Sequence, residues 1–86
     1  MESNKVALVT GANKGLGFET SRQLAQKGIK VIMGSRDLSR GNASAEILKK
    51  ENLDVEVFEL DVTNPEHIRN AQKYIEEIKS ILHKYE

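Results

Sequence analysis

Short apolar runs alternate with longer amphipathic stretches along this chain. Apolar runs are typical of strands buried in a sheet, and they occupy three segments, Lys5–Thr10, Lys30–Met33 and Val55–Leu60. The other stretches repeat apolar residues at helical spacing, over Gly15–Lys27, over Asp37–Glu51 and from Thr63 almost to the end of the chain. The pattern therefore predicts three strands, each followed by a helix.

Residues at the ends of the predicted helices support these boundaries. Gly28 and Asn52 are suited to helix ends, and Asp37 can cap the second helix. The run Thr63-Asn64-Pro65-Glu66 matches a capping box with proline in the first turn of the third helix. We expect apolar residues of the second and third helices to face inward, with Leu38 and Ile68 among them, and Leu16 and Leu24 lie on one side of the first helix. Gly41 should weaken the second helix by about 1 kcal/mol relative to alanine.

This alternation predicts an α/β fold with a parallel sheet and right-handed crossovers. The strands of a doubly wound sheet would lie in the order 3-2-1, which makes the β-α-β-α-β-α unit a three-layer half of a Rossmann fold. At 86 residues the chain is long enough for one domain, so we assign residues 1–86 to a single dinucleotide-binding unit. The two glutamates in Val55–Leu60 predict that this strand lies at a sheet edge.

A glycine-rich stretch joins the first strand to the first helix, with the sequence Thr10-Gly11-Ala12-Asn13-Lys14-Gly15-Leu16-Gly17. Gly11 permits a tight turn, Gly15 lets the backbone approach an anion, and Gly17 lets the helix pack close to the strand. The helix N-terminus has unpaired N–H groups and a partial positive charge, which suits a diphosphate. The alternative is a glycine-rich turn that binds no ligand.

The end of the second strand predicts which dinucleotide is bound. An acidic residue there would bind the ribose hydroxyls of NAD, but this chain has Ser35 and Arg36. Ser35 can donate a hydrogen bond to a phosphate, and Arg36 can pair with that phosphate and stack on adenine. Lys14 adds a second cation. These residues favour a 2′-phosphate and hence NADP(H), whereas the alternative is that both basic side chains are simply solvated.

The composition of the chain argues against several classes of function. Thirteen basic and thirteen acidic residues give a formal net charge of zero, so charge provides no argument for nucleic acid or for an anionic membrane. The chain has no cysteine, which excludes thiol catalysis and cysteine metal sites in these residues. The first residues do not resemble a signal peptide, and no apolar run approaches the roughly 20 residues of a membrane span. We therefore expect a cytoplasmic protein.

Three motifs together resemble the short-chain dehydrogenase/reductase family, and more narrowly its carbonyl reductase group. They are Val6–Glu19, then Ser35-Arg36-Asp37 with Arg40-Gly41, and then Leu60-Asp61-Val62-Thr63. The resemblance implies an NADPH-dependent oxidoreductase that reduces carbonyl compounds. It also implies that Asn13, Lys14 and Arg36 contact phosphate and ribose, that Leu16 lies at the diphosphate turn, and that Asp61 and Val62 contact adenine. For Asp61 the alternative is a turn residue that precedes a helix.

The family's catalytic residues do not appear in this sequence. Members of the family continue into a fourth strand with an Asn-Asn-Ala-Gly motif, a catalytic serine and a Tyr-x-x-x-Lys pair. Here Tyr74 is followed four residues later by Ile78, and no lysine follows Tyr85. We expect both tyrosines to be packing residues. The chain is thus expected to bind cofactor weakly, to lack the catalytic half and to be inactive alone.

A missing fourth strand would leave the first strand at a sheet edge. An unpaired apolar edge invites pairing with another chain, so we expect a homodimer formed through the first strand. The alternative to a cofactor-binding half is then a truncated or engineered scaffold that self-associates and retains a vestigial cofactor loop.

Overall fold

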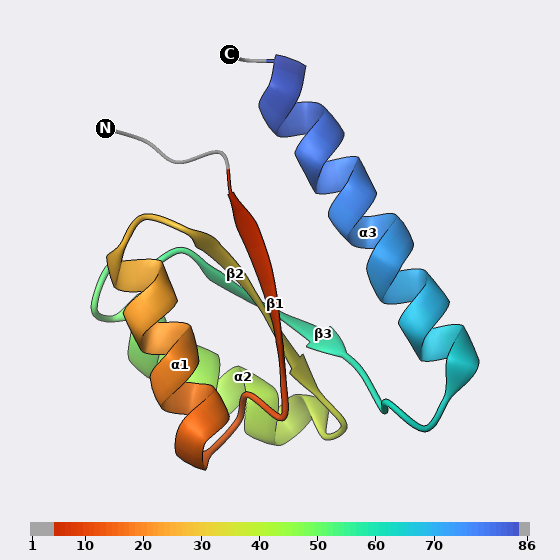
Figure 1. Ribbon diagram of the computed structural model, residues 1–86. Helices are drawn as coiled ribbons and strands as arrows, with labels where there is room; N and C mark the ends of the chain where they lie inside the picture. The colour runs from red at the N-terminus through yellow and green to blue at the C-terminus, as the bar shows by residue number, and fades with distance from the viewer. Residues whose placement is uncertain (1–4, 85–86) are drawn as a thin grey trace.

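Strands and helices alternate as the sequence predicts (Figure 1). The computed structural model describes residues 5–84, and the side chains of residues 5–78. The elements are β1 (Val6–Thr10), α1 (Gly15–Gln26), β2 (Lys30–Ser35), α2 (Leu38–Lys49), β3 (Val55–Glu59) and α3 (Pro65–Lys84). β2 is longer than predicted, because its pairing continues to Gly34 with β1 and to Ser35 with β3.

The three strands form one parallel sheet in the order β1-β2-β3, which confirms the predicted order 3-2-1. Val6 lies opposite Lys30, and Val31 lies opposite Val55. β3 occupies one edge of the sheet, as its glutamates predict. Among the described residues, β1 pairs with β2 alone and so forms the other edge.

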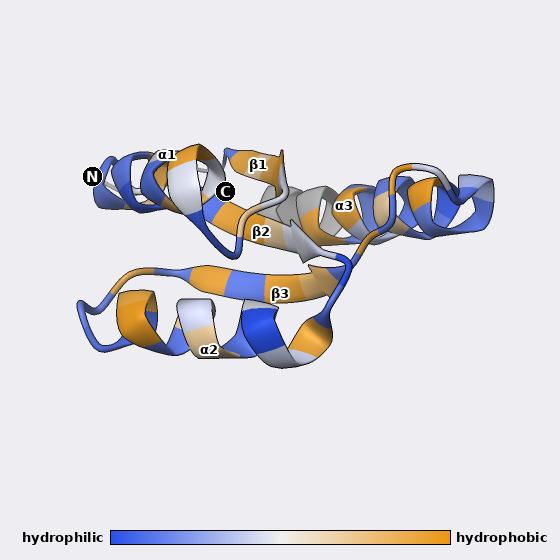
Figure 2. Ribbon diagram, turned by 90° about the horizontal axis from the view of Figure 1, so that it is seen from below, coloured by the Kyte–Doolittle hydropathy of each residue, from blue (hydrophilic) through white to orange (hydrophobic). Residues whose placement is uncertain are grey.

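Helices cover both faces of the sheet, so the unit has three layers. α1 and α2 lie on one face and α3 on the other (Figures 1 and 2). Alternate residues of β3 reflect this division: Val55 and Val57 join the core beneath α1 and α2, while Phe58 stacks on Tyr74 of α3 with ring centroids 5.2 Å apart. The largest fully buried apolar side chains are Ile32, Met33, Leu48 and Val31.

The ends of the helices follow the predicted residues with one correction. Gly28 and Asn52 have positive φ angles of 85° and 64°, and the Asp37 carboxylate accepts a hydrogen bond from the Arg40 N–H. The predicted capping box is wrong in its first residue. Asn64 caps α3 by accepting from the N–H of Glu66 at 2.9 Å, whereas Thr63 bonds to Asp61 instead.

Two apolar residues predicted to face inward are exposed instead, Leu38 at 43% and Ile68 at 39%, and Leu16 is likewise 84% exposed. All three lie in the first turn of a helix, and each of these turns begins at the edge where the strands end. The first turn therefore overhangs the sheet and has no strand beneath it to cover an apolar side chain. The inward residues Ala45, Leu48, Ala71 and Ile78 are buried as predicted, whereas the side chains of Leu82 and Tyr85 fall outside the described part.

Gly41 has a packing role that its low helix propensity does not suggest. A Cβ atom at this position would lie 2.9 Å from Ser35 Cβ and 2.9 Å from Val57 Cγ1. The missing side chain thus lets α2 approach β2 and β3 closely. Real Cβ atoms almost never make contacts this short, so an alanine here would push the helix away from the sheet.

Candidate nucleotide-binding site

The glycine-rich loop turns sharply at the carboxyl end of β1 and is held in place by two neighbouring segments. Gly11 and Gly15 have φ angles of 60° and 61°, a conformation that side chains disfavour. The Ala12 N–H donates to the Gly34 carbonyl at 3.1 Å, which ties the loop to β2. The Ser44 hydroxyl of α2 donates to the Asn13 carbonyl and fixes the loop from the other side.

α1 begins directly after this loop with its first N–H groups uncapped by any side chain. Lys14 precedes the helix in an extended conformation and makes no capping bond, and the first turn contains no acidic residue. The partial positive charge of the helix N-terminus is therefore left unneutralised by α1 itself. A Cβ on Gly17 would lie 2.4 Å from the Gly11 carbonyl oxygen, so this glycine allows the close contact of helix and loop that the sequence predicts.

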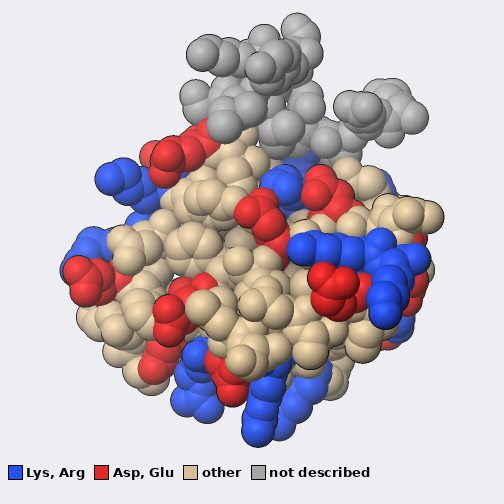
Figure 3. All heavy atoms as spheres, turned by 180° about the vertical axis from the view of Figure 1, so that it is seen from behind, with Lys and Arg blue, Asp and Glu red and all other residues tan. Residues whose placement is uncertain are grey.

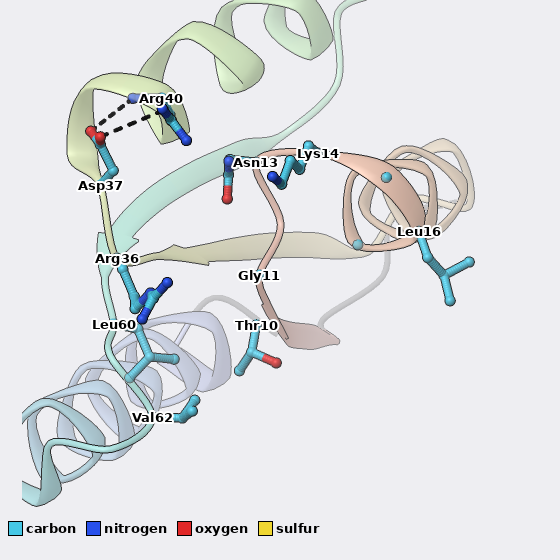
Figure 4. Close-up of a pocket in the computed structure, with 12 residues that line it drawn as sticks. Thr10, Gly11, Asn13, Lys14, Leu16, Arg36, Asp37, Arg40, Leu60 and Val62 are labelled. Atoms are coloured by element: carbon cyan, nitrogen blue, oxygen red, sulfur yellow. Dashed lines mark hydrogen bonds and ion pairs between the residues drawn. The ribbon is translucent and has the colours of Figure 1, made fainter.

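An open cavity of about 720 Å³ lies in front of the loop (Figure 4). Eight of the ten residues predicted to bind cofactor line it: Gly11, Asn13, Lys14, Gly15, Leu16, Gly17, Arg36 and Val62. Four lining residues were not among those predicted: Thr10, Asp37, Arg40 and Leu60.

Three cationic side chains gather on this cavity from three different segments. Lys14 comes from the loop, Arg36 from the end of β2 and Arg40 from the first turn of α2. The Arg40 side chain is 71% exposed, and its Nε lies 3.7 Å from the Asp37 carboxylate. Lysine and arginine side chains project from the lower edge of the molecule in Figure 3, the edge at which the strands end. The positive charge is thus local, although the chain as a whole is neutral.

Arg40 shows what the sequence reasoning missed at this site. The spacing from Arg36 to Arg40 is one helical turn, which places the second arginine at the start of a helix that follows a strand end. The Arg40-Gly41 motif is the sequence signal for this residue, although Arg40 does not directly follow a strand. A cation in the first turn of the next helix reaches the same edge of the sheet.

Ser35 and Asp61, the two remaining predicted residues, have side chains engaged elsewhere. Ser35 is 1% exposed, and its hydroxyl donates to the Asp37 carbonyl at 2.8 Å. The Asp61 carboxylate accepts hydrogen bonds from the Thr63 hydroxyl at 2.7 Å and the Thr63 N–H at 2.9 Å. Neither residue lines the cavity, and their contacts with a cofactor stay predictions.

The electrostatics of Asp61 nevertheless connect it to the cavity. The two hydrogen bonds from Thr63 lower the pKa of the Asp61 carboxyl, and the nearby charge of Arg36 lowers it further. The Asp61 N–H donates to His67 Nδ1 at 3.1 Å, so α3 also orients this turn. Val62 follows with 56% of its surface exposed and adds an apolar side chain to the lining of the cavity.

The glycine loop, the uncapped helix and the parallel β-α-β-α-β-α order all match one protein family. The family model for short-chain dehydrogenases matches residues 5–83. This chain belongs to that family. The match confirms the resemblance drawn from the sequence and includes every element that carries the cavity.

Individual relatives of this short-chain dehydrogenase agree with the family match. Carbonyl reductase [NADPH] 3 from Rattus norvegicus is 41% identical over 73 residues, which are 84% of this chain and 26% of that protein. The structure of menthone neomenthol reductase from Mentha piperita has a TM-score of 0.79 at 44% identity, over 85% of this chain and 27% of that one. A metagenomic short-chain oxidoreductase in complex with NADP has a TM-score of 0.79 at 26% identity, over 86% of this chain and 34% of that one.

These comparisons also define how much of a relative the chain represents. It spans about a quarter of the length of the curated relatives that it matches. Within the residues that the structure describes, no helix has the length and apolar character needed to cross a membrane.

Proposed function

We propose that this member of the short-chain dehydrogenase family binds NADP(H) in the cavity beside the glycine loop. One observation carries the proposal: Lys14, Arg36 and Arg40 converge on the same cavity as the uncapped N-terminus of α1. Two phosphate positions are implied by two separate sources of positive charge, the helix N-terminus and the arginines. The relative named as an NADPH carbonyl reductase and the neighbour in complex with NADP add support.

The residues present fit the parts of this cofactor. Glycines at 11 and 15 have open space where a Cβ would stand, which leaves room for a diphosphate against the backbone. Arg36 and Arg40 would hold the 2′-phosphate, with Lys14 as a further cation, and Val62 offers an apolar surface to the adenine. The bound cofactor would supply a hydride from its nicotinamide. The loop and α1 would orient the diphosphate that connects the two halves of the cofactor.

We further propose that residues 1–86 bind the cofactor without reducing a carbonyl compound by themselves. The family resemblance implies a Tyr-x-x-x-Lys pair as proton donor, and this pair is absent from the sequence. Tyr74 donates its hydroxyl to Glu56 and stacks on Phe58, on the sheet face opposite α1 and α2. Carbonyl reduction would therefore require residues that belong to the remaining three quarters of the related enzymes.

A cofactor titration tests this proposal. NADPH binding to the purified chain is measured by calorimetry, with NADH in a parallel titration. Loss of a charge-assisted contact of about 1.5–3 kcal/mol should weaken NADPH binding by roughly tenfold to a hundredfold in Arg36→Ala, while NADH binding changes little. Arg69→Ala is the matched control, because Arg69 is an exposed arginine on α3 that does not line the cavity. Failure to bind millimolar NADPH, or equal affinity for NADPH and NADH, would refute it.

The position of β1 favours a second function, self-association through the sheet edge. The Lys30 N–H bonds to the Lys5 carbonyl, so by alternation the backbone groups of Val6 and Leu8 point away from β2. We infer that a second copy of this chain pairs with that edge to form a twofold dimer. Self-association by itself does not exclude cofactor binding, whereas the scaffold alternative also requires that the cofactor loop is vestigial.

Sedimentation at tens of micromolar tests the dimer. Val6→Pro removes an edge N–H at the first residue of the strand, where proline is tolerated, and should produce a monomer. Val6→Thr keeps the N–H and the branched side chain and should stay dimeric. A monomeric parent chain would refute self-association.

A further inference from the structure

Ser39 stands apart from the other serines whose side chains the structure describes. Ser21, Ser35 and Ser44 are buried, and each donates its hydroxyl to a backbone carbonyl. Ser39 is exposed in the first turn of α2. Of the hydroxyls in this set, only that of Ser39 is therefore open to an enzyme from solution.

Two arginines flank Ser39 in the sequence. Arg36 lies three residues before it and Arg40 directly after it, a pattern read by protein kinases that recognise an arginine upstream of the acceptor. Asp37 is extended, with φ −113° and ψ 108°, so the helix begins only at Leu38. The Asp37 side chain caps this turn through a 3.2 Å hydrogen bond from the Arg40 N–H and an exposed ion pair, while the buried Ser35 hydroxyl and the Gly41 N–H bond to the Asp37 backbone.

Both flanking arginines line the cofactor cavity. A phosphate on Ser39 would carry a charge of about −2 within three residues of the two arginines that are proposed to hold the 2′-phosphate. Arginines bind phosphoserine through charge-assisted hydrogen bonds and would be drawn away from the cofactor. The position in the first turn of α2 also tolerates this charge, because anions are favourable near a helix N-terminus. Phosphorylation would thus compete with the cofactor without unfolding the helix.

We propose that Ser39 is a phosphorylation site for an arginine-directed protein kinase and that its phosphate weakens NADP(H) binding. The inference rests on the proposed function. In the transfer, the Ser39 Oγ forms a bond to the γ-phosphorus of ATP as the bond to the bridging oxygen breaks. ADP leaves, and the hydroxyl proton passes to the kinase. Removal of the phosphate by hydrolysis would restore the free arginines.

The test begins with the catalytic subunit of cyclic-AMP-dependent protein kinase and magnesium ATP. Phosphorylation of the full chain is located by mass spectrometry, and Ser39→Ala should remove the signal. NADPH is then titrated into the phosphorylated and unmodified chains, and the phosphorylated chain should bind at least about tenfold more weakly. Ser39→Glu should weaken binding in the same direction, while Gln72→Glu, which adds one charge on the exposed surface of α3, should not.

The outcomes separate this inference from the proposed function. If the unmodified chain does not bind millimolar NADPH, the proposed function fails and the inference fails with it. If the unmodified chain binds but the phosphorylated chain binds equally well, the inference alone is overturned. Absence of phosphate at Ser39, under conditions in which a control peptide is modified, also overturns it.

Discussion

Replacing Gly17 by alanine tests whether the close contact of α1 with the loop holds the site together. The added Cβ would lie 2.4 Å from the Gly11 carbonyl oxygen, 3.0 Å from the Gly11 carbonyl carbon and 3.1 Å from Ala12 Cα. Ordinary contacts begin at 3.4 Å, so the helix must move by about 1 Å at this point. All three neighbours are backbone atoms, which cannot rotate aside as a flexible side chain would.

The expected cost follows from two opposing effects. Overpacking of this kind costs about 1–3 kcal/mol, while alanine in place of glycine returns up to about 1 kcal/mol of helix propensity. We therefore expect Gly17→Ala to lower the free energy of unfolding by about 1–2 kcal/mol. In a domain of this size each 1 kcal/mol corresponds to roughly 4–8 °C in melting temperature.

Circular dichroism at 222 nm during urea and thermal unfolding measures this change. Gln23→Ala on the exposed side of the same helix is the matched control and should stay within about 0.5 kcal/mol of the parent. NADPH affinity should fall in Gly17→Ala alone, because the N-terminus of α1 is displaced from the loop. A variant as stable as the parent, with unchanged NADPH affinity, would show that helix and loop do not need this contact.

Two further predictions concern the supports of the sheet and the loop. Burial raises the pKa of the Glu56 carboxyl, but hydrogen bonds from Tyr74 and Lys30 outweigh that effect and hold the pKa below its ordinary value of 4.5. Glu56 thus contributes stability that is present above its unfolded pKa and is lost as the pH falls. Tyr74→Phe keeps the ring but removes one of the two donors to Glu56. In urea unfolding it should lower the free energy of unfolding by about 1 kcal/mol near pH 7 and by less below pH 4.5. A loss that stays constant down to pH 3 would contradict this account. Ser44→Ala should lower the free energy of unfolding by about 1 kcal/mol and increase amide hydrogen exchange in the glycine loop, because the Asn13 carbonyl loses its donor. Unchanged exchange in the loop would mean that the bond from Ala12 to β2 is enough to hold it.

Much of this fold is encoded in local sequence. The apolar runs and helical repeats predicted all six elements in order, because strand and helix differ in the period with which side chains face the core. Gly11, Gly15, Gly28 and Asn52 marked backbone positions that the structure realises with positive φ angles. The loop residues predicted to bind cofactor all line the cavity, because a strand, a glycine turn and a helix in succession determine where the loop must lie.

The rim of the cavity was less predictable, since it depends on contacts between distant segments. Ser35 is the last residue of β2 and does not follow the strand, and the parity of that strand turns its hydroxyl inward beneath Gly41. The bond from Ser44 to Asn13 joins residues 31 positions apart, and no local pattern signals it. His67 likewise reaches back to Asp61 across the turn that precedes α3.

The sequence by itself determined the order of elements, the parallel sheet and the glycine turn, because these depend on periodicity and on backbone conformations that few residues adopt. Only the tertiary structure decided which side chains surround the cavity. It exposed Leu16, brought Arg40 beside Arg36 and Lys14, and withdrew Ser35 into the packing between strand and helix. The physical reason is that a side chain's direction at a strand end or in a first helical turn is set by how the layers overlap.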